Sequence, residues 1–271
     1  LSRNQPHHRT NNVGTTKRGK QVADPVMLEI FNNLFMSIAE QMGFVLEKTA
    51  QSITIKERLD FSCAIFDKNG ELIANAPHMP VHLGSMDSTV KSIINNNSNL
   101  SPGDIFAINA PYNGGTHLPD ITIVNPIWNF EKTEIIFYTA ARGHHTDIGG
   151  LTPGSMPCNS TNINQEGIYI DNWKIVSNGI FREKAIKEKL LSGQYPARSP
   201  STNIADLKAQ IAACKKGETE LLKIIDKYGV ETVFRFQELI CQNAENAVRE
   251  TIRTIKSEEI TYCMDNDLSG E

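Results

Sequence analysis

The sequence predicts an α+β fold (mixed α/β) with an N-terminal helix, a central mixed sheet carrying metal-site loops, and C-terminal helices. Apolar residues recur at helical spacing near the N-terminus and over the last third of the chain, whereas the middle holds short β-rich runs separated by turn residues. The 271 residues are 39% hydrophobic and 21% charged, with 18 Gly and 12 Pro. This composition excludes collagen-like, low-complexity and wholly disordered proteins.

Residues 1–22 are predicted to form a linker or tail, because they contain almost no apolar side chains. Asp24 followed by Pro25 is typical of a helix start. The helix is expected to run to about Thr49, since apolar residues recur every three or four positions. These residues are Leu28, Phe31, Leu34, Phe35, Ile38, Met42, Val45 and Leu46.

The middle of the chain is predicted to form the sheet. Runs at 61–66 and 72–74 flank Asp67-Lys68-Asn69-Gly70, which indicates a hairpin. A helix over about 83–95 is expected next. Further strands are expected at 105–109, 121–128 and 134–141. Residues 151–164 are rich in Gly, Pro, Ser and Asn, so they are predicted to form a long loop or lid.

The last third of the chain is predicted to be helical, and its end to be polar. The expected helices are 183–191, 204–228 and 230–256. Residues 257–271 are acidic and polar, which indicates a flexible tail. The chain is therefore expected to contain one domain over 23–256, between two tails.

Charge and cysteine content restrict the class of partner. With 27 basic and 31 acidic residues the net charge is −4, so no basic field attracts nucleic acid or an anionic membrane. No run of eighteen apolar residues is present that could span a membrane. The five cysteines form no CxxC pair. A reducing cytoplasm and a small-molecule substrate are the expectations that follow.

Two Gly-rich segments carry histidines and carboxylates, and the predicted topology brings them together. They read NGGTHLPD (113–120) and ARGHHTDIGG (141–150). The two strands between them are joined by a short polar link, and an antiparallel hairpin places the start of its first strand beside the end of its second. Asp120 should therefore lie opposite residues 142–144.

Imidazole and carboxylate ligands suit a divalent ion such as zinc, manganese or iron. His117 with Asp120 alone is explained equally well as a surface pair on a turn, but a histidine placed opposite them favours a metal site. His144 and His145 are not both expected to bind one ion, because adjacent side chains on an extended chain diverge. One is expected to be a ligand, and the other to contact substrate or a carboxylate such as Asp147.

Two upstream segments hold further candidates. Asp60 directly precedes an apolar strand and could supply another metal oxygen, although the charged residues before it also fit a solvated helix end or loop. His78 and His82 lie four residues apart, but Pro77 and Pro80 argue against a helical metal pair. Loop packing and lining of a substrate pocket are both open for these two histidines.

Six segments together resemble the hydantoinase B family, which includes the C-terminal part of ATP-dependent 5-oxoprolinase. They are FMSIAEQMG (35–43), IKERLDFSC (55–63), PHMPVHLG (77–84), GGTHLPD (114–120), RGHHTDIGG (142–150) and GSMP (154–157). The resemblance extends from about Asp24 to about Thr254. Its first and third segments are most similar to 5-oxoprolinase itself.

The resemblance implies a reaction and a set of site residues. In this family an A-type module binds ATP and phosphorylates the amide oxygen of a cyclic substrate, and the B-type module hydrolyses the activated ring. In 5-oxoprolinase, an enzyme of glutathione metabolism, the product is glutamate. The positions matching the expected metal ligands are Asp60, His117, Asp120 and His144. The implied ion is manganese, zinc or magnesium, and His145 or Asp147 is expected to transfer a proton or orient the substrate.

The resemblance also implies partners. B-type modules are longer than this chain, so we expect it to be the N-terminal part of one, to lack turnover alone and to assemble into an oligomer. The sequence contains no GxxxxGK[ST] or GxGxxG motif, so ATP is expected to bind the A-type module, fused or separate. The alternatives are an N-methylhydantoinase, an acetone-carboxylase-like subunit, or a non-catalytic assembly fragment.

Overall fold

The computed structural model describes residues 24–76 and 78–262. Within these ranges the chain has the predicted α+β fold. The helices are α1 (Pro25–Thr49), α2 (Ile53–Lys56), α3 (Pro80–Asn96), α4 (Glu183–Leu190), α5 (Pro200–Tyr228) and α6 (Val230–Thr254), with the 3-10 helices η1 (Pro111–Asn113) and η2 (Ile163–Gln165). The strands are β1 (Phe61–Asp67), β2 (Leu72–Asn75), β3 (Ile105–Ile108), β4 (Asp120–Trp128), β5 (Ile135–His144), β6 (Trp173–Ser177) and β7 (Ile180–Phe181).

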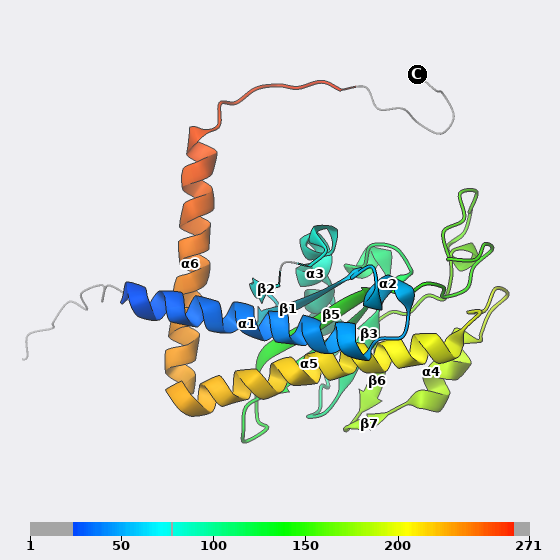
Figure 1. Cartoon of the computed structure of the whole chain (residues 1–271), viewed down its shortest axis with the longest axis horizontal. Coiled ribbons are helices and arrows are strands. Elements are labelled where there is room, and N and C mark those ends of the chain that lie inside the picture. Colours follow the sequence, from blue (N-terminus) through cyan, green and yellow to red (C-terminus); the bar gives the residue numbers. More distant parts are fainter. Residues whose placement is uncertain (1–23, 77, 263–271) are drawn as a thin grey trace, which may run out of the picture.

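These strands form one sheet in the order β2-β1-β5-β4-β3-β6-β7. The sheet lies behind α1 and α5 in the view of Figure 1. Each neighbouring pair is antiparallel, so the sheet is antiparallel rather than mixed as expected from the sequence. The β4–β5 hairpin was predicted, and it lies at the centre of the sheet. β1 pairs with β5 although β2, α3, β3 and β4 separate them along the chain.

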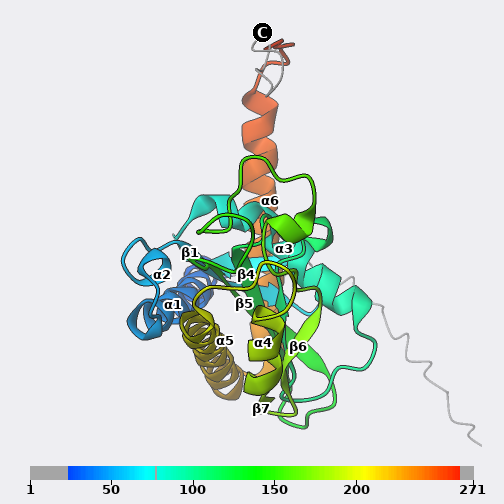
Figure 2. The ribbon, with the colours of Figure 1, turned by 90° about the vertical axis from the view of Figure 1, so that its right-hand side faces the viewer.

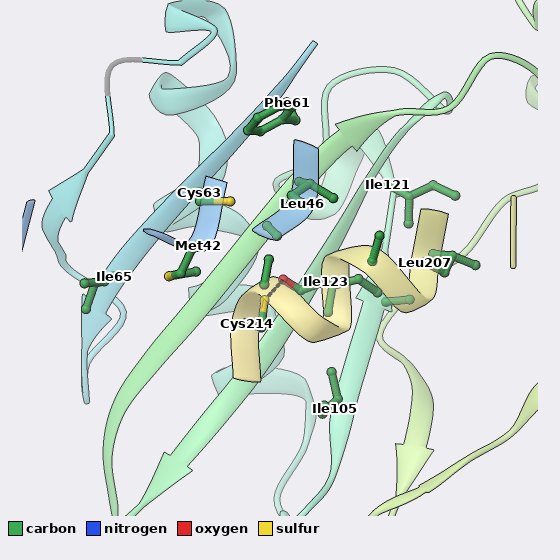
Figure 3. Packing of buried hydrophobic residues seen from close by; sticks show 14 of the residues in the cluster. Met42, Leu46, Phe61, Cys63, Ile65, Ile105, Ile121, Ile123, Leu207 and Cys214 are labelled. Atoms are coloured by element: carbon green, nitrogen blue, oxygen red, sulfur yellow. Dashed lines mark hydrogen bonds between the residues drawn. The ribbon is translucent and has the colours of Figure 1, made fainter. Parts of the chain in front are cut away.

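The sheet is covered on both faces, and alternate side chains of its strands enter two hydrophobic cores. On one face Cys63 and Ile65 of β1 pack with Met42 of α1 and with α5 (Figure 3). On the opposite face Phe66 packs with Met86 of α3. Figure 2 shows α1 and α5 running together along one side of the sheet. Because both faces are buried, the strands read as nearly continuous apolar runs in the sequence.

The first helix begins as predicted. The side chain of Asp24 accepts a hydrogen bond of 3.0 Å from the backbone N–H of Val26, and Pro25 occupies the first turn. This cap satisfies one of the N–H groups that have no partner within the helix. The buried stripe of α1 then runs from Phe31 to Leu46 and faces the sheet.

The start of α3 differs from the prediction. The prolines of segment 77–82 were expected to exclude a helix, yet α3 begins at Pro80. Proline has no N–H to donate, which costs nothing at the first helical position, so here it starts a helix. His82 therefore lies on the first turn of α3, while His78 precedes the helix.

The remaining differences include the short helix α2, which was not predicted, and elements in the second half of the chain. β6 and β7 were not expected, and α5 begins at Pro200 rather than near residue 204. α6 first packs beside α1 and then extends away from the rest of the fold (Figure 1). The loop predicted over 151–164 is irregular as far as η2.

Parts of the predicted tails can be compared with the structure. Residues 257–262 are irregular and exposed, whereas the expected linker at 1–22 and residues 263–271 lie outside the described residues. In the described ranges, none of the helices combines the length and apolar character needed to cross a membrane.

Candidate metal centre

Two histidines and one carboxylate meet where β4 begins and β5 ends. Nδ1 of His117 lies 3.1 Å from Oδ2 of Asp120, and Nδ1 of His144 lies 3.1 Å from Oδ1 of the same carboxylate. One ligand atom from each of the three residues lies within 4.8 Å of the other two. The β4–β5 ladder pairs Asp120 directly with His144, which is the juxtaposition predicted from the hairpin.

The loop that carries His117 is held against the sheet and α3. Gly114 has a φ of 86°, and a Cβ at this position would collide with the backbone of α3 at Thr89. The side-chain amide of Asn109 donates a 2.8 Å hydrogen bond to the carbonyl of Leu118. A glycine and a buried amide therefore place the histidine loop over the start of β4.

The charges of the three ligands favour a bound cation. Burial raises the pKa of Asp120, but hydrogen bonds with His117 and His144 and from Thr116 outweigh burial and leave the pKa well below its usual range. The same hydrogen bond raises the pKa of His144. Asp120 is thus an ionised, nearly buried carboxylate, and the two histidines of the triad carry no permanent positive charge to balance it.

The donor set fits a divalent metal. Two imidazole nitrogens and one carboxylate oxygen form the ligand chemistry of zinc and manganese sites. The side chain of His117 is 38% exposed, compared with 4% for Asp120, so the centre is open on the histidine-loop side. Three protein ligands with an open side are typical of catalytic rather than structural metal sites.

Asp60 lies beside this triad rather than in it. Its Oδ1 is 3.5 Å from Nε2 of His82, and this same nitrogen is 3.6 Å from Oδ2 of Asp120. The backbone carbonyl of Asp60 accepts a 3.0 Å hydrogen bond from the N–H of His144. Asp60 therefore lies next to the triad, separated from Asp120 by a histidine whose place there was not predicted, and its part as a metal ligand stays a prediction. The sequence signal that could have placed His82 here is its position two residues after Pro80, the proline that starts α3.

Arg142 is a second residue whose role was missed. It is completely buried on β5, and its Nε donates a 2.8 Å hydrogen bond to Oγ1 of Thr122. Its Nη1 reaches Oγ of Ser85 at 2.6 Å, and its Nη2 reaches the carbonyl of Gly114 at 3.2 Å. Burial lowers its pKa to about 10. An arginine inside an otherwise apolar strand was the signal, since a buried charge must be hydrogen-bonded.

His145 and Asp147 contact other groups. Nε2 of the fully buried His145 lies 3.1 Å from Oε1 of Gln210, and Nδ1 lies 3.2 Å from Nδ2 of Asn203. Oδ2 of Asp147 accepts a 2.6 Å hydrogen bond from Nη1 of Arg198. The second histidine thus contacts amides of α5, not the carboxylate suggested as its partner. A part for either residue in catalysis stays a prediction.

Comparison with known proteins agrees with the resemblance. A match to the Hydantoinase B/oxoprolinase family covers residues 24–269. The chain belongs to this family. It is 45% identical to 5-oxoprolinase 1 of Arabidopsis thaliana over 255 residues, which are 90% of this chain and 20% of that protein. It is 46% identical to the 5-oxoprolinase of Dictyostelium discoideum over 243 residues, 89% of this chain and 19% of that one.

A solved structure supports the fold. The crystal structure of the ATP-dependent caprolactamase from Pseudomonas jessenii matches with a TM-score of 0.79 at 29% sequence identity. The match covers 88% of this chain and 40% of that chain. This chain spans about a fifth of the length of the two 5-oxoprolinases it matches.

Proposed function

We propose that the chain supplies the metal-dependent hydrolytic site of an ATP-dependent cyclic-amide hydrolase that opens 5-oxoproline to glutamate. The observation that carries this proposal is the triad of His117, Asp120 and His144 at one open end of the sheet. The identity of about 45% to proteins named 5-oxoprolinase supports 5-oxoproline as the substrate. The caprolactamase, at 29% identity, is named for a different cyclic amide.

The three triad residues hold the ion in this proposal, and Asp60 is its fourth ligand. A divalent manganese, zinc or magnesium ion, when bound, would polarise the substrate oxygen and lower the pKa of a bound water. Asp120 anchors both histidines through its two oxygens, and the exposed side of His117 leaves room for substrate. In the overall hydrolysis water adds to the ring carbonyl carbon, the C–N bond breaks and the nitrogen takes up a proton.

His145 and Asp147 are proposed to orient the backbone segments next to the metal ligand His144. His145 is held between two amides of α5, which fixes the chain that follows His144. Asp147 accepts backbone hydrogen bonds from Gly149 and Gly154, both at 3.0 Å, and so shapes the next loop. Orientation fits these contacts better than proton transfer, because His145 has no exposed surface.

ATP is proposed to bind an A-type module, fused or separate, and residues 23–256 to be the N-terminal part of a B-type domain. The share of about a fifth that the chain takes of its 5-oxoprolinase relatives is consistent with such further modules. On this proposal the isolated chain binds metal and does not turn over substrate. The remaining modules supply the phosphorylated substrate and complete the pocket.

Reconstitution tests the proposal. The chain, joined to the remainder of a 5-oxoprolinase, is expected to release glutamate and ADP in equal amounts from 5-oxoproline and ATP. Asp120→Asn should abolish glutamate release, and Asp226→Asn, at an exposed position of α5, should not. A panel of 5-oxoproline, caprolactam and N-methylhydantoin identifies the ring. Full glutamate release by the Asp120→Asn enzyme would contradict the proposal.

A further inference from the structure

His82 occupies a place that the triad does not explain. It comes from the first turn of α3, whereas Asp60 precedes β1 and Asp120 begins β4. The residue is only 2% exposed, and its Nε2 lies between the two carboxylates, 3.5 Å from one and 3.6 Å from the other. A single buried imidazole therefore links two acidic residues from distant parts of the sequence.

The surroundings of the ring indicate which nitrogen carries the hydrogen. Both carboxylates are hydrogen-bond acceptors when ionised, so Nε2 has a favourable contact only as a donor. Nδ1 lies 3.3 Å from Oγ of Ser62, a hydroxyl that also lies 3.0 Å from the carbonyl of Met79. The single hydrogen of the Ser62 hydroxyl is donated to the Met79 carbonyl, so this contact does not decide whether Nδ1 also carries a hydrogen, whereas the two carboxylates require one on Nε2.

Arg142 fixes the turn of α3 that presents this ring. Its Nη1 donates to the carbonyl of His82 at 3.2 Å and to Oγ of Ser85 at 2.6 Å. Its Nη2 donates to Oγ1 of Thr89 at 2.8 Å, one turn farther along α3. Since Arg142 belongs to β5, the strand that ends at His144, the guanidinium ties α3 to a strand of the metal centre. The backbone that carries the His82 ring is therefore tied to β5, the strand that carries His144 of the triad.

We propose that His82 is a positioning residue that holds the carboxylates of Asp60 and Asp120 in the orientation required to bind one metal ion. The inference rests on the proposed metal centre and extends it to a residue outside the ligand set. Replacing a polar group that contacts the ligands of a metal from outside the ligand set commonly changes metal affinity 10- to 100-fold. His82 acts through the two carboxylates and does not contact substrate.

The first experiment measures manganese and zinc affinity by competition with a chelator. His82→Leu is expected to weaken binding about 10- to 100-fold, because leucine fills the space without donating. His82→Gln should retain more affinity, since its side chain keeps an N–H donor. His78→Leu is the matched control, because its ring packs on Phe61, at 4.7 Å between centroids, in the same segment. Equal affinity in a folded His82→Leu protein and wild type would overturn the proposal.

The second experiment needs no metal. Nitrogen-15 spectra of the metal-free protein should show His82 protonated on Nε2, and Asp60→Ala and Asp120→Ala should each shift that signal while the signal of His78 stays unchanged. A ring protonated only on Nδ1, or an Nε2 signal that neither variant shifts, would overturn the proposal. If wild type binds no metal, the proposed function fails, and these spectra still decide the role of His82.

Discussion

Asp120 shows how much of the centre follows from the sequence at the scale of single residues. Its meeting with His144 was predictable, because a short hairpin fixes the register between the start of one strand and the end of the next. The places of His82 and Asp60 were less predictable, since they depend on β1 pairing with β5 and on the start of α3. Arg142 is the first residue of the RGHHTDIGG segment, yet only its hydrogen bonds reveal that it joins β5 to α3.

His145 gives a pH prediction at the residue scale. Burial lowers its pKa, so its neutral form stabilises the fold above the unfolded pKa of about 6.5, and this stabilisation is lost as the pH falls through the folded pKa. At pH 8, His145→Gln is expected to lower the free energy of unfolding by about 1–3 kcal/mol. The difference between wild type and variant should shrink toward pH 5.

Urea unfolding of metal-free protein at pH 8, 7, 6 and 5 measures this difference. Asp226→Asn, at an exposed position, serves as the control for general pH effects. A gap between wild type and His145→Gln that stays constant across the series would show that His145 is not held neutral.

At the scale of elements, the crossing of α5 over the sheet depends on a glycine. A Cβ on Gly217 would lie 2.5 Å from Sδ of Met42 and 2.8 Å from Cγ2 of Thr139, so the helix, α1 and β5 approach too closely for a methyl group. Gly217→Ala gains up to about 1 kcal/mol of helix propensity but overpacks the core by about 1–3 kcal/mol. We expect a net loss of about 1 kcal/mol in the free energy of unfolding.

Gly84 of α3 is the matched case, because no atom of the described residues lies within 4 Å of the Cβ position there. Gly84→Ala should therefore stabilise the protein by about 0.5–1 kcal/mol. Chemical denaturation of the two variants compares them directly. Equal effects of the same sign would contradict the close packing of α5 on α1 and β5.

The elements that were missed had weak or ambiguous local signals. β6 and β7 are joined by Asn178-Gly179, both with positive φ, which is a hairpin turn, but β7 has only two residues and its pattern is too short to recognise. Pro80 was interpreted as a helix breaker, but the effect of proline depends on its position, and at the start of a helix it is favoured. By contrast, α1 has an N-cap, a proline and a long apolar stripe, and all three agree.

At the scale of the whole molecule, the order of the strands was beyond local reasoning. The pairing Phe61–Gly143 joins distant segments, and no short-range pattern specifies it. Burial of the sheet by α1 and α5 on one face and α3 on the other explains why several strands lack a clear alternation. The fold class could be predicted, whereas the antiparallel order had to come from the structure.

The second half of α6 contributes little to this packing. Every residue from Gln242 to Thr254 is exposed, while Val233 and Phe236 near its start are buried. Truncation after Gln242 is therefore expected to change the melting temperature by less than about 2 °C. Truncation after Gly229, which removes the buried part of α6 as well, should lower it much more. Calorimetry of the two truncated proteins checks this; equal melting temperatures would show that α6 is not part of the core.

The metal content of the purified chain tests the central claim most directly. Elemental analysis after loading with manganese, zinc or magnesium should give about one divalent ion per chain in wild type. Asp120→Ala should retain none, because Asp120 contacts both histidines of the triad. Asp226→Ala should bind as wild type does. No ion in the wild-type chain under any loading, or an ion retained by a folded Asp120→Ala protein, would contradict a metal centre built on these residues.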